Sequence, residues 1–318
     1  MFGVFIRALA VALALFPALV LAQSPVRSFP PGMFQNRAAL DASSGGAAYT
    51  GPGDIVASAT IWLGLRAYTA AYATGLGNAA DIVDTATGLA SCTIPLTSSG
   101  DLNLSGTICP TVSPTVSVIT FCTVTHAAGC SVSKLYDQTG GGLHLTQATL
   151  ASMPTFVLNC VGSTHPCINF TGGQTLTNGT GFSLSRPYSS TAVIERTSGT
   201  GYECAICSNG FNQSWLFGNG ANLINFYSNG DSTVAATDNA FHSASAANSI
   251  PNGLKIYIDG ALTSASGVTA TYSGAIGMGS AGGSLNCTCR VNEYGVWSGD
   301  FTTNNSVINA NAKTYWGF

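Results

Sequence analysis

Cys130-Ser-Val-Ser-Lys-Leu-Tyr-Asp-Gln-Thr-Gly-Gly-Gly-Leu-His-Leu-Thr-Gln147 is the stretch of sequence that decides the fold. Residues 132–136 alternate between two faces, which predicts a short strand. The strand ends at Asp137, whose carboxylate can accept hydrogen bonds from backbone amides two residues on. Glycines at 140–142 allow positive φ angles, and a second strand starts at Leu143. The stretch therefore predicts a hairpin whose loop has a defined geometry.

The core of this stretch, Leu135-Tyr-Asp-Gln-Thr-Gly-Gly-Gly-Leu-His-Leu-Thr-Gln-Ala148, follows a closely spaced cysteine pair and precedes Met153-Pro-Thr155. In this setting it resembles the catalytic domain of the α-L-arabinofuranosidase B family. The run Gly64-Leu-Arg-Ala-Tyr-Thr-Ala-Ala-Tyr72 is similar to the opening of that domain. The resemblance implies an all-β, concanavalin A-like sandwich (jelly roll) with a few short helices. It also implies a secreted glycoside hydrolase that removes terminal α-L-arabinofuranosyl residues.

The C-terminal half carries a second resemblance, to laminin-G and concanavalin-type sandwiches. Its clearest element is Asn252-Gly-Leu-Lys-Ile-Tyr-Ile-Asp-Gly260, in which three aliphatic residues face one way and Asp-Gly forms a favoured two-residue hairpin turn. A Gly-rich strand (residues 275–279) and a Glu-bearing strand (residues 290–297) follow, as in those folds. The resemblance implies a structural role for Glu293.

Composition favours one large β-rich domain: the chain has 318 residues, 38 of them Gly and 10 Cys, and only 7% are charged. The net charge of -3 comes without any basic block. Nucleic acid is therefore excluded as a partner, because no cluster could neutralise successive phosphates. No internal repeat of constant period is present, which argues against a solenoid or propeller.

The N-terminus has the features of a signal peptide at residues 1–22, with Arg7 in a positive region, an apolar stretch and a Val-Leu-Ala22 cleavage site. Residues 23–53 are rich in Pro, Ser, Gly and Ala and predict a flexible lead-in. We expect the domain to occupy residues 54–318. No later segment is long and apolar enough to span a membrane, so a secreted, periplasmic or cell-surface location is expected.

The even number of cysteines in an exported chain predicts a disulfide framework. Sequence alone leaves the connectivity open, but local pairs would each close a short loop: Cys92–Cys109, Cys122–Cys130, Cys160–Cys167, Cys204–Cys207 and Cys287–Cys289. A zinc site formed by the last two pairs is the alternative. Calcium bound by loop aspartates such as Asp81 and Asp84 is another. We expect solvated turn carboxylates instead, and neither a metal nor any other cofactor.

Several further elements can be predicted from periodicity. Residues 57–72 place Leu65, Tyr68 and Tyr72 on one helical face, which predicts a short helix. Residues 116–121 are β-branched and predict a strand, as do residues 155–169 and 190–196. A terminal helix is predicted for residues 304–315 from the spacing of Ile308, Ala312 and Tyr315.

Glycoside hydrolysis needs two carboxyl groups flanking the scissile bond. The region that corresponds to the family's nucleophile strand, residues 215–231, contains no Glu, and Asp231 is its only candidate catalytic carboxylate. At the place of the family's acid stands Ser280 or Ala281, and neither side chain can protonate a leaving oxygen. We therefore expect both family carboxylates to be missing, which leaves catalytic activity an open question.

A binding role needs fewer residues. The cysteine pair that lines the family's sugar pocket has an approximate counterpart here, and aromatic and amide side chains suited to sugars lie nearby. The candidate substrate-binding residues are Cys204, Cys207, Trp215, Asn225 and Tyr227. The expected partner is a polysaccharide or other glycan, arabinose-containing or similar. The alternative to a hydrolase is a non-catalytic carbohydrate-binding domain or a structural sandwich domain of an envelope or virion.

Overall fold

The structure is a computed structural model that describes residues 48–110, 114–161, 164–199, 201–208, 213–218, 223–227, 231–235, 240–250, 253–266, 271–280 and 284–318. Within the chain, Ala47–Phe318 forms one compact unit. The predicted signal peptide and most of the predicted lead-in lie outside the described residues.

Strands dominate the fold, joined by short helices. The strands are β1 (Ala59–Gly64), β2 (Asn78–Asp84), β3 (Ser91–Pro95), β4 (Thr107–Cys109), β5 (Val116–Ser117), β6 (Cys130–Leu135), β7 (Leu145–Thr146), β8 (Thr155–Val161), β9 (His165–Thr171), β10 (Leu176–Thr177), β11 (Phe182–Leu184), β12 (Tyr188–Arg196), β13 (Glu203–Ser208), β14 (Ser214–Phe217), β15 (Leu223–Tyr227), β16 (Asp231–Ala235), β17 (His242–Ser249), β18 (Gly253–Ile258), β19 (Ala261–Ser266), β20 (Tyr272–Gly274), β21 (Ile276–Met278) and β22 (Thr288–Trp297). The helices are α2 (Pro52–Ile55), α3 (Ala70–Thr74), α4 (Val118–Thr120), the π-helix η1 (Phe121–Thr125), the 3-10 helices η2 (Leu150–Ser152) and η3 (Thr302–Asn304), and α5 (Asn305–Trp316).

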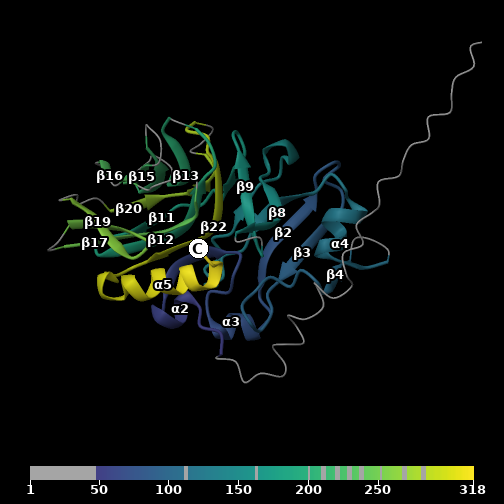
Figure 1. The fold of residues 1–318 in the computed structure, drawn as a ribbon, viewed down its shortest axis with the longest axis horizontal. Helices are drawn as coiled ribbons and strands as arrows, with labels where there is room; N and C mark the ends of the chain where they lie inside the picture. The colour runs from purple at the N-terminus through teal and green to yellow at the C-terminus, as the bar shows by residue number, and fades with distance from the viewer. Residues whose placement is uncertain are drawn as a thin grey trace, which may run out of the picture. The chain divides into compact units, whose positions relative to one another are not determined.

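Two antiparallel layers make the sandwich (Figure 1). Sheet 1 runs β1-β22-β12-β17-β18-β19, and sheet 2 runs β10-β21-β13-β14-β15-β16. Side chains from both inner faces join one apolar core, and the Trp215 indole Nε1 of sheet 2 donates to Ser190 Oγ of sheet 1 at 3.0 Å. The predicted all-β sandwich is confirmed.

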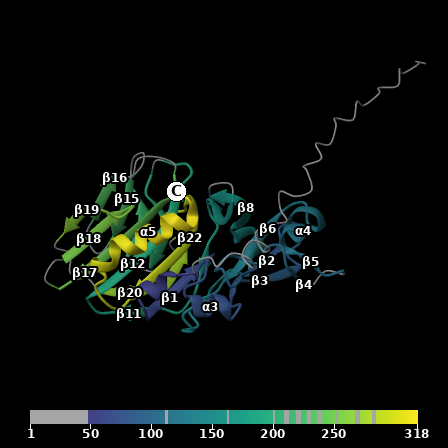
Figure 2. The same ribbon diagram turned by 60° about the horizontal axis from the view of Figure 1, so that its bottom comes forward.

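Helix α5 lies across the outer face of sheet 1 (Figure 2). Ile308, Ala312 and Trp316 are buried on its inner side, so the predicted terminal helix is confirmed. Polar groups also join the two elements, because Ser243 Oγ of β17 donates to Asn309 Oδ1 at 2.6 Å. Trp316 Nε1 donates to Glu293 of β22 at 2.9 Å. The outer face of sheet 1 is therefore occupied by the chain itself.

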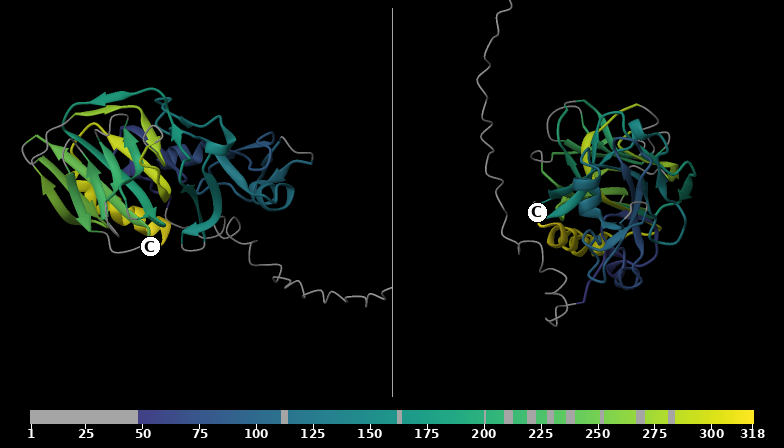
Figure 3. Two further views of the ribbon diagram at one scale, coloured as in Figure 1. Left: turned by 90° about the horizontal axis from the view of Figure 1, so that it is seen from above. Right: turned by 90° about the vertical axis from the view of Figure 1, so that its right-hand side faces the viewer.

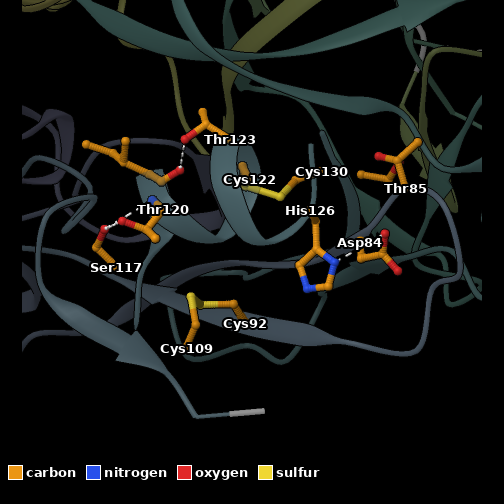
Figure 4. The surroundings of a disulfide bond; sticks show 12 residues. Asp84, Thr85, Cys92, Cys109, Ser117, Thr120, Cys122, Thr123, His126 and Cys130 are labelled. Atoms are coloured by element: carbon orange, nitrogen blue, oxygen red, sulfur yellow. Dashed lines mark hydrogen bonds and ion pairs between the residues drawn. A yellow bond between two sulfur atoms is a disulfide. The ribbon is translucent and has the colours of Figure 1, made fainter. Parts of the chain in front are cut away.

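A small lobe continues from the sandwich through β9, which pairs with β22. It contains β2, β3, β6 and β8, and Figure 3 shows β2 and β3 in blue, away from the green strands β15 to β19. Figure 4 shows two disulfides here, Cys92–Cys109 and Cys122–Cys130. The His126 ring beside them lies with Nδ1 3.5 Å from Asp84 Oδ1.

All ten cysteines form disulfides in the local pairs that the sequence suggests. The zinc alternative is therefore wrong, because the last two pairs are oxidised to disulfides and supply no thiolates. In the described parts of the chain, no group of three or more His, Cys, Asp or Glu side chains could hold a metal ion.

The hairpin loop of the signature stretch is confirmed in detail. Asp137 Oδ1 accepts from the backbone N–H of Trp62 and Thr139, and Oδ2 accepts from that of Leu143, at 3.1–3.3 Å. The next residue, Gln138, donates to the Gly64 carbonyl at 2.9 Å. Since both side chains are buried and bonded to backbone, the loop clamps β1 and has a structural role.

Two predicted elements are wrong. Residues 57–72 form β1 and, separately, α3 capped by Thr69, because the run at residues 61–63 is buried on both faces of a strand and so shows no alternation. The predicted strand at residues 116–121 is only two residues long. Ser117 Oγ then accepts from Thr120 N and starts a helical turn, so a local cap overrides the β-branched preference.

Candidate functional site

The outer face of sheet 2 brings most of the candidate residues together. Residues directly opposite in an antiparallel pair point to the same face. Cys204 lies opposite Leu216, and Leu216 lies opposite Asn225. Tyr227, two positions after Asn225, lies opposite Asp231. These positions therefore share the face that points away from the core.

Trp215 lies on the other side of the sheet. Its side chain is fully buried, and its ring packs against Phe226 with the centroids 4.7 Å apart. The indole N–H is already used, because it donates to Ser190 of sheet 1. Trp215 is thus part of the inner core and is not brought together with the other candidate residues.

Cys204 and Cys207 form a disulfide between two β13 positions. Both residues are buried, and together with Leu216 they form a small apolar cluster. Two partly buried side chains, Tyr227 and Leu285, pack against this cluster. The backbone N–H of Cys204 donates to the Leu285 carbonyl at 2.8 Å, which fixes Leu285 beside the disulfide.

Asn225 is the unusual polar residue of this face. Its side chain is only 1% exposed, yet neither Nδ2 nor Oδ1 has a hydrogen-bond partner. Leaving a buried polar group without a partner costs about 1–3 kcal/mol. The amide thus carries both a donor and an acceptor that the protein does not use.

Asp231 is placed only through its backbone, at the start of β16 opposite Tyr227. Its side chain lies outside the described residues. The position expected for the family's acid is occupied by buried Ser280, while Ala281 lies outside the described residues. No geometry for a carboxylate pair can therefore be built on this face from the side chains that the structure describes.

Acidic side chains elsewhere are engaged in structural contacts. Of the 13 acidic residues, three (Asp41, Asp231 and Asp238) have side chains outside the described set, and every other carboxylate has a hydrogen-bond partner from the protein. Asp81 and Asp84, the calcium alternative, accept from hydroxyl and amide donors of their own lobe. Both belong to β2 and Asp84 is buried, so the expectation of solvated turn carboxylates is wrong here. Burial raises the pKa of the Glu195 carboxyl, although Arg290 binds it at 2.9 Å and opposes this shift.

Two residues near the site were missed by sequence reasoning. Arg196 is buried and donates to Glu203 Oε1 and to two backbone carbonyls beside β13. Tyr202, just before β13, is 44% exposed. The segment Gly199-Thr-Gly-Tyr202 was the available signal, since an aromatic residue that directly follows a glycine-rich turn and precedes a strand is a candidate for an exposed ring.

Solved structures show where this architecture occurs. A GH54 α-L-arabinofuranosidase soaked with a cyclic sulfate inhibitor is similar with a TM-score of 0.60 and 15% sequence identity. A crystal structure of an arabinofuranosidase complexed with arabinofuranosyl-α-1,2-xylobiose is similar with a TM-score of 0.56 and 17% identity. This chain has the arabinofuranosidase fold. The predicted resemblance is thus confirmed at the level of fold.

The likeness covers 82% of this chain and 64% of each of those two solved chains. No protein-family model and no curated protein matches the chain. None of the helices in the described ranges is long and apolar enough to cross a membrane.

Proposed function

We propose that this protein is an exported glycan-binding domain with the arabinofuranosidase fold, and that it binds its ligand on the outer face of sheet 2 without hydrolysing it. Asn225 carries the proposal. Once the side chains over it move aside, a buried amide with a free donor and a free acceptor matches adjacent hydroxyl groups of a sugar, each of which can both donate and accept. The cost of leaving the amide unpaired is recovered when a ligand supplies these bonds.

The carboxylates that the structure describes support binding without hydrolysis. Two-carboxylate catalysis needs one group with a raised pKa and one ionised group on either side of the bond. The described carboxylates are held by structural donors, and Glu195, whose pKa is raised by burial, is bound to Arg290. Export is supported by the signal-peptide features and by five disulfides, which persist in oxidising compartments.

An arabinose-containing polysaccharide is the ligand class to test first, because the structurally similar proteins are arabinofuranosidases. We expect saturable binding to arabinan or arabinoxylan in affinity electrophoresis and calorimetry. Asn225→Ala should weaken binding by about tenfold, the loss expected for roughly 1.4 kcal/mol. Wild-type protein that binds no polysaccharide of a plant and microbial panel would contradict the proposal.

Hydrolysis through Asp231 is the second candidate, because its backbone position on β16 pairs with Tyr227, two positions from Asn225. It predicts release of arabinose from a chromogenic arabinofuranoside and loss of that activity in Asp231→Asn. The assay should run from about pH 3 to about pH 8, so that a shifted carboxyl is sampled in both charge states. No turnover across this range would leave binding as the function.

A further inference from the structure

The Cys204–Cys207 disulfide is covered in this structure. Although both residues lie on the outer face of sheet 2, they are 0% and 2% exposed. Leu285 packs on this cluster, and its backbone is held in place by the bond from Cys204 N. Its φ of 53° is an unfavourable conformation for a residue with a Cβ. A sugar ring could stack on the disulfide only by displacing Leu285.

An exposed ring lies close by. Tyr202 is 44% exposed, and among the residues that the structure describes it is the one exposed aromatic side chain. Glu203 of β13 lies opposite Phe217 of β14, so the next positions along the two strands are Tyr202 and Gly218. Because Gly218 has no side chain, the Tyr202 ring has no side-chain neighbour at that position of β14.

The backbone on both sides of this ring is anchored by one guanidinium. Arg196 Nη2 donates to the Gly201 carbonyl at 2.7 Å, and Nη1 donates to the Gly218 carbonyl at 3.2 Å. Nη2 also contacts Glu203 Oε1 at 3.2 Å. Arg196 is 4% exposed, and its charge is paired with Glu203, so this anchor belongs to the interior. It fixes the segments before and beside Tyr202, which reduces the entropy lost when a ligand binds.

The unpartnered amide belongs to the same patch. A Cβ added at Gly218 would lie 3.2 Å from Asn225 Nδ2, so the amide packs directly over that glycine. Tyr202, Gly218 and Asn225 thus lie on the same face of sheet 2, where the ring is exposed and the amide is buried beside it. A sugar on the ring reaches the unused donor and acceptor when the side chains over the amide move aside. Aromatic faces bind the C–H side of sugar rings, while amides bind their hydroxyl groups.

We infer that Tyr202, in place of the covered disulfide, is the stacking platform for a neutral sugar ring, and that Arg196 positions it. This inference rests on the proposed glycan-binding function. It assigns the ligand as an uncharged ring with adjacent hydroxyls, because Arg196, the cation that the described residues place beside the platform, is already paired with Glu203.

The test compares Tyr202→Ala with Tyr202→Phe in arabinoxylan and arabinan binding by the full exported chain. Tyr202→Ala should weaken binding by about tenfold, whereas Tyr202→Phe, which keeps the ring, should stay within about twofold of wild type. Leu262→Ala is the matched control, since Leu262 is an exposed apolar residue on β19 of the other sheet. Thermal unfolding of each variant verifies that it is folded.

Nitration gives an independent readout. Tetranitromethane modifies accessible tyrosines, and no free cysteine competes for it. Mass spectrometry should show that saturating polysaccharide protects the Tyr202 peptide, while half-buried Tyr72 of α3 is unaffected. If Tyr202→Ala binds as tightly as wild type, or if the ligand does not protect the Tyr202 peptide, the inference is overturned and the proposed function stands. Wild-type protein that binds no glycan overturns both.

Discussion

The two outer faces of the sandwich use buried polar side chains differently, although Trp62 Nε1 of β1 and Asn305 Nδ2 of α5 also lack a partner. On sheet 1, Glu293 accepts from Arg66 and Trp316, and Ser243 donates to Asn309 of the covering helix. On sheet 2, the amide of Asn225 is equally buried but has no partner from the protein. The first arrangement holds α5 on the sheet, and the second leaves bonding capacity for something else.

This difference indicates that the outer face of sheet 1 contributes to stability and that of sheet 2 to binding. A satisfied buried network makes its surroundings rigid, whereas an unsatisfied group lowers stability and persists where it serves another purpose. Substitutions on the two faces should therefore change stability in opposite directions, and only those on sheet 2 should change glycan binding.

The largest effect is expected at the ion pair under α5. Glu293→Ala would leave Arg66, which is fully buried, without its carboxylate partner. Removing one partner of a buried pair costs about 3–5 kcal/mol, so the free energy of unfolding in urea should fall by that amount. Glu195→Ala is the control, since Arg290 is 33% exposed and such a pair contributes at most about 1 kcal/mol. Equal losses in the two variants would contradict this ranking.

A pair of matched Asn→Leu changes compares the two faces directly. Asn309→Leu should lower the free energy of unfolding by about 1–3 kcal/mol, because it removes the partner of Ser243 and the amide that donates to Ser245. Asn225→Leu should raise it by about 1 kcal/mol, since a buried unpaired amide is replaced by an apolar group of similar size. Urea unfolding measures both changes.

Glycan binding distinguishes the two Asn→Leu variants further. Asn225→Leu should lose affinity for the polysaccharide while gaining stability, and Asn309→Leu should keep its affinity as long as it is folded. Loss of stability in Asn225→Leu would show that the amide has a structural partner, such as a bound water, and would remove the contrast between the two faces.

The small lobe also contains a buried polar side chain with partners from the protein, Asp84, and its contribution to stability depends on pH. The hydroxyl of Thr87 donates to Asp84 and, despite burial, holds the pKa of that carboxyl below its usual range, helped by the N–H groups of Ala86 and Thr87. A carboxyl whose pKa is lower in the folded protein stabilises the fold at pH values above its unfolded pKa of about 3.9. This contribution is lost as the pH falls through the folded pKa.

Asp84→Asn should therefore have a lower Tm than wild type at neutral pH, and the gap should narrow below about pH 4. Calorimetry between about pH 7 and about pH 3 measures it. Glycan binding at neutral pH should be unchanged, because Asp84 ends β2, whose described strand partners are β3 and β6 and not a strand of sheet 2. A Tm difference that widens in acid would mean that folding raises the pKa of Asp84 instead of lowering it.

Much of the fold could be predicted from local sequence. The Asp137 hairpin, the Asp259-Gly260 turn and α5 follow from turn chemistry and periodicity, and these elements are confirmed. Strand β1 could not be predicted, because burial on both faces removes the alternation that identifies a strand. Its environment is created by β22 and the Asp137 loop, which are distant in sequence.

The candidate site was only partly predictable for a related reason. Alternation identifies two faces of a strand but not which of them points to the core. Trp215 and Asn225 lie on adjacent strands, but Trp215 points to the core and Asn225 away from it. The bond from Trp215 to Ser190, which lies in the other sheet, could not be read from either strand alone. Arg196 acts through the backbone carbonyls of Gly201 and Gly218, and no sequence pattern records such bonds.

The smallest stability effect, and the sharpest functional one, is expected at Leu285. Leu285→Gly relieves a positive φ, worth about 1–2 kcal/mol, while losing the partial burial of a leucine of similar magnitude, so the free energy of unfolding should change by less than about 1 kcal/mol. Uncovering the disulfide adds a second apolar surface beside Tyr202, so polysaccharide binding should become tighter. In the double variant Tyr202→Ala/Leu285→Gly, the uncovered disulfide should supply part of the apolar surface lost with the Tyr202 ring. Its affinity should therefore be higher than that of Tyr202→Ala alone. Calorimetric titration of the four proteins measures this coupling, and strictly additive effects would mean that the two surfaces do not serve the same ligand.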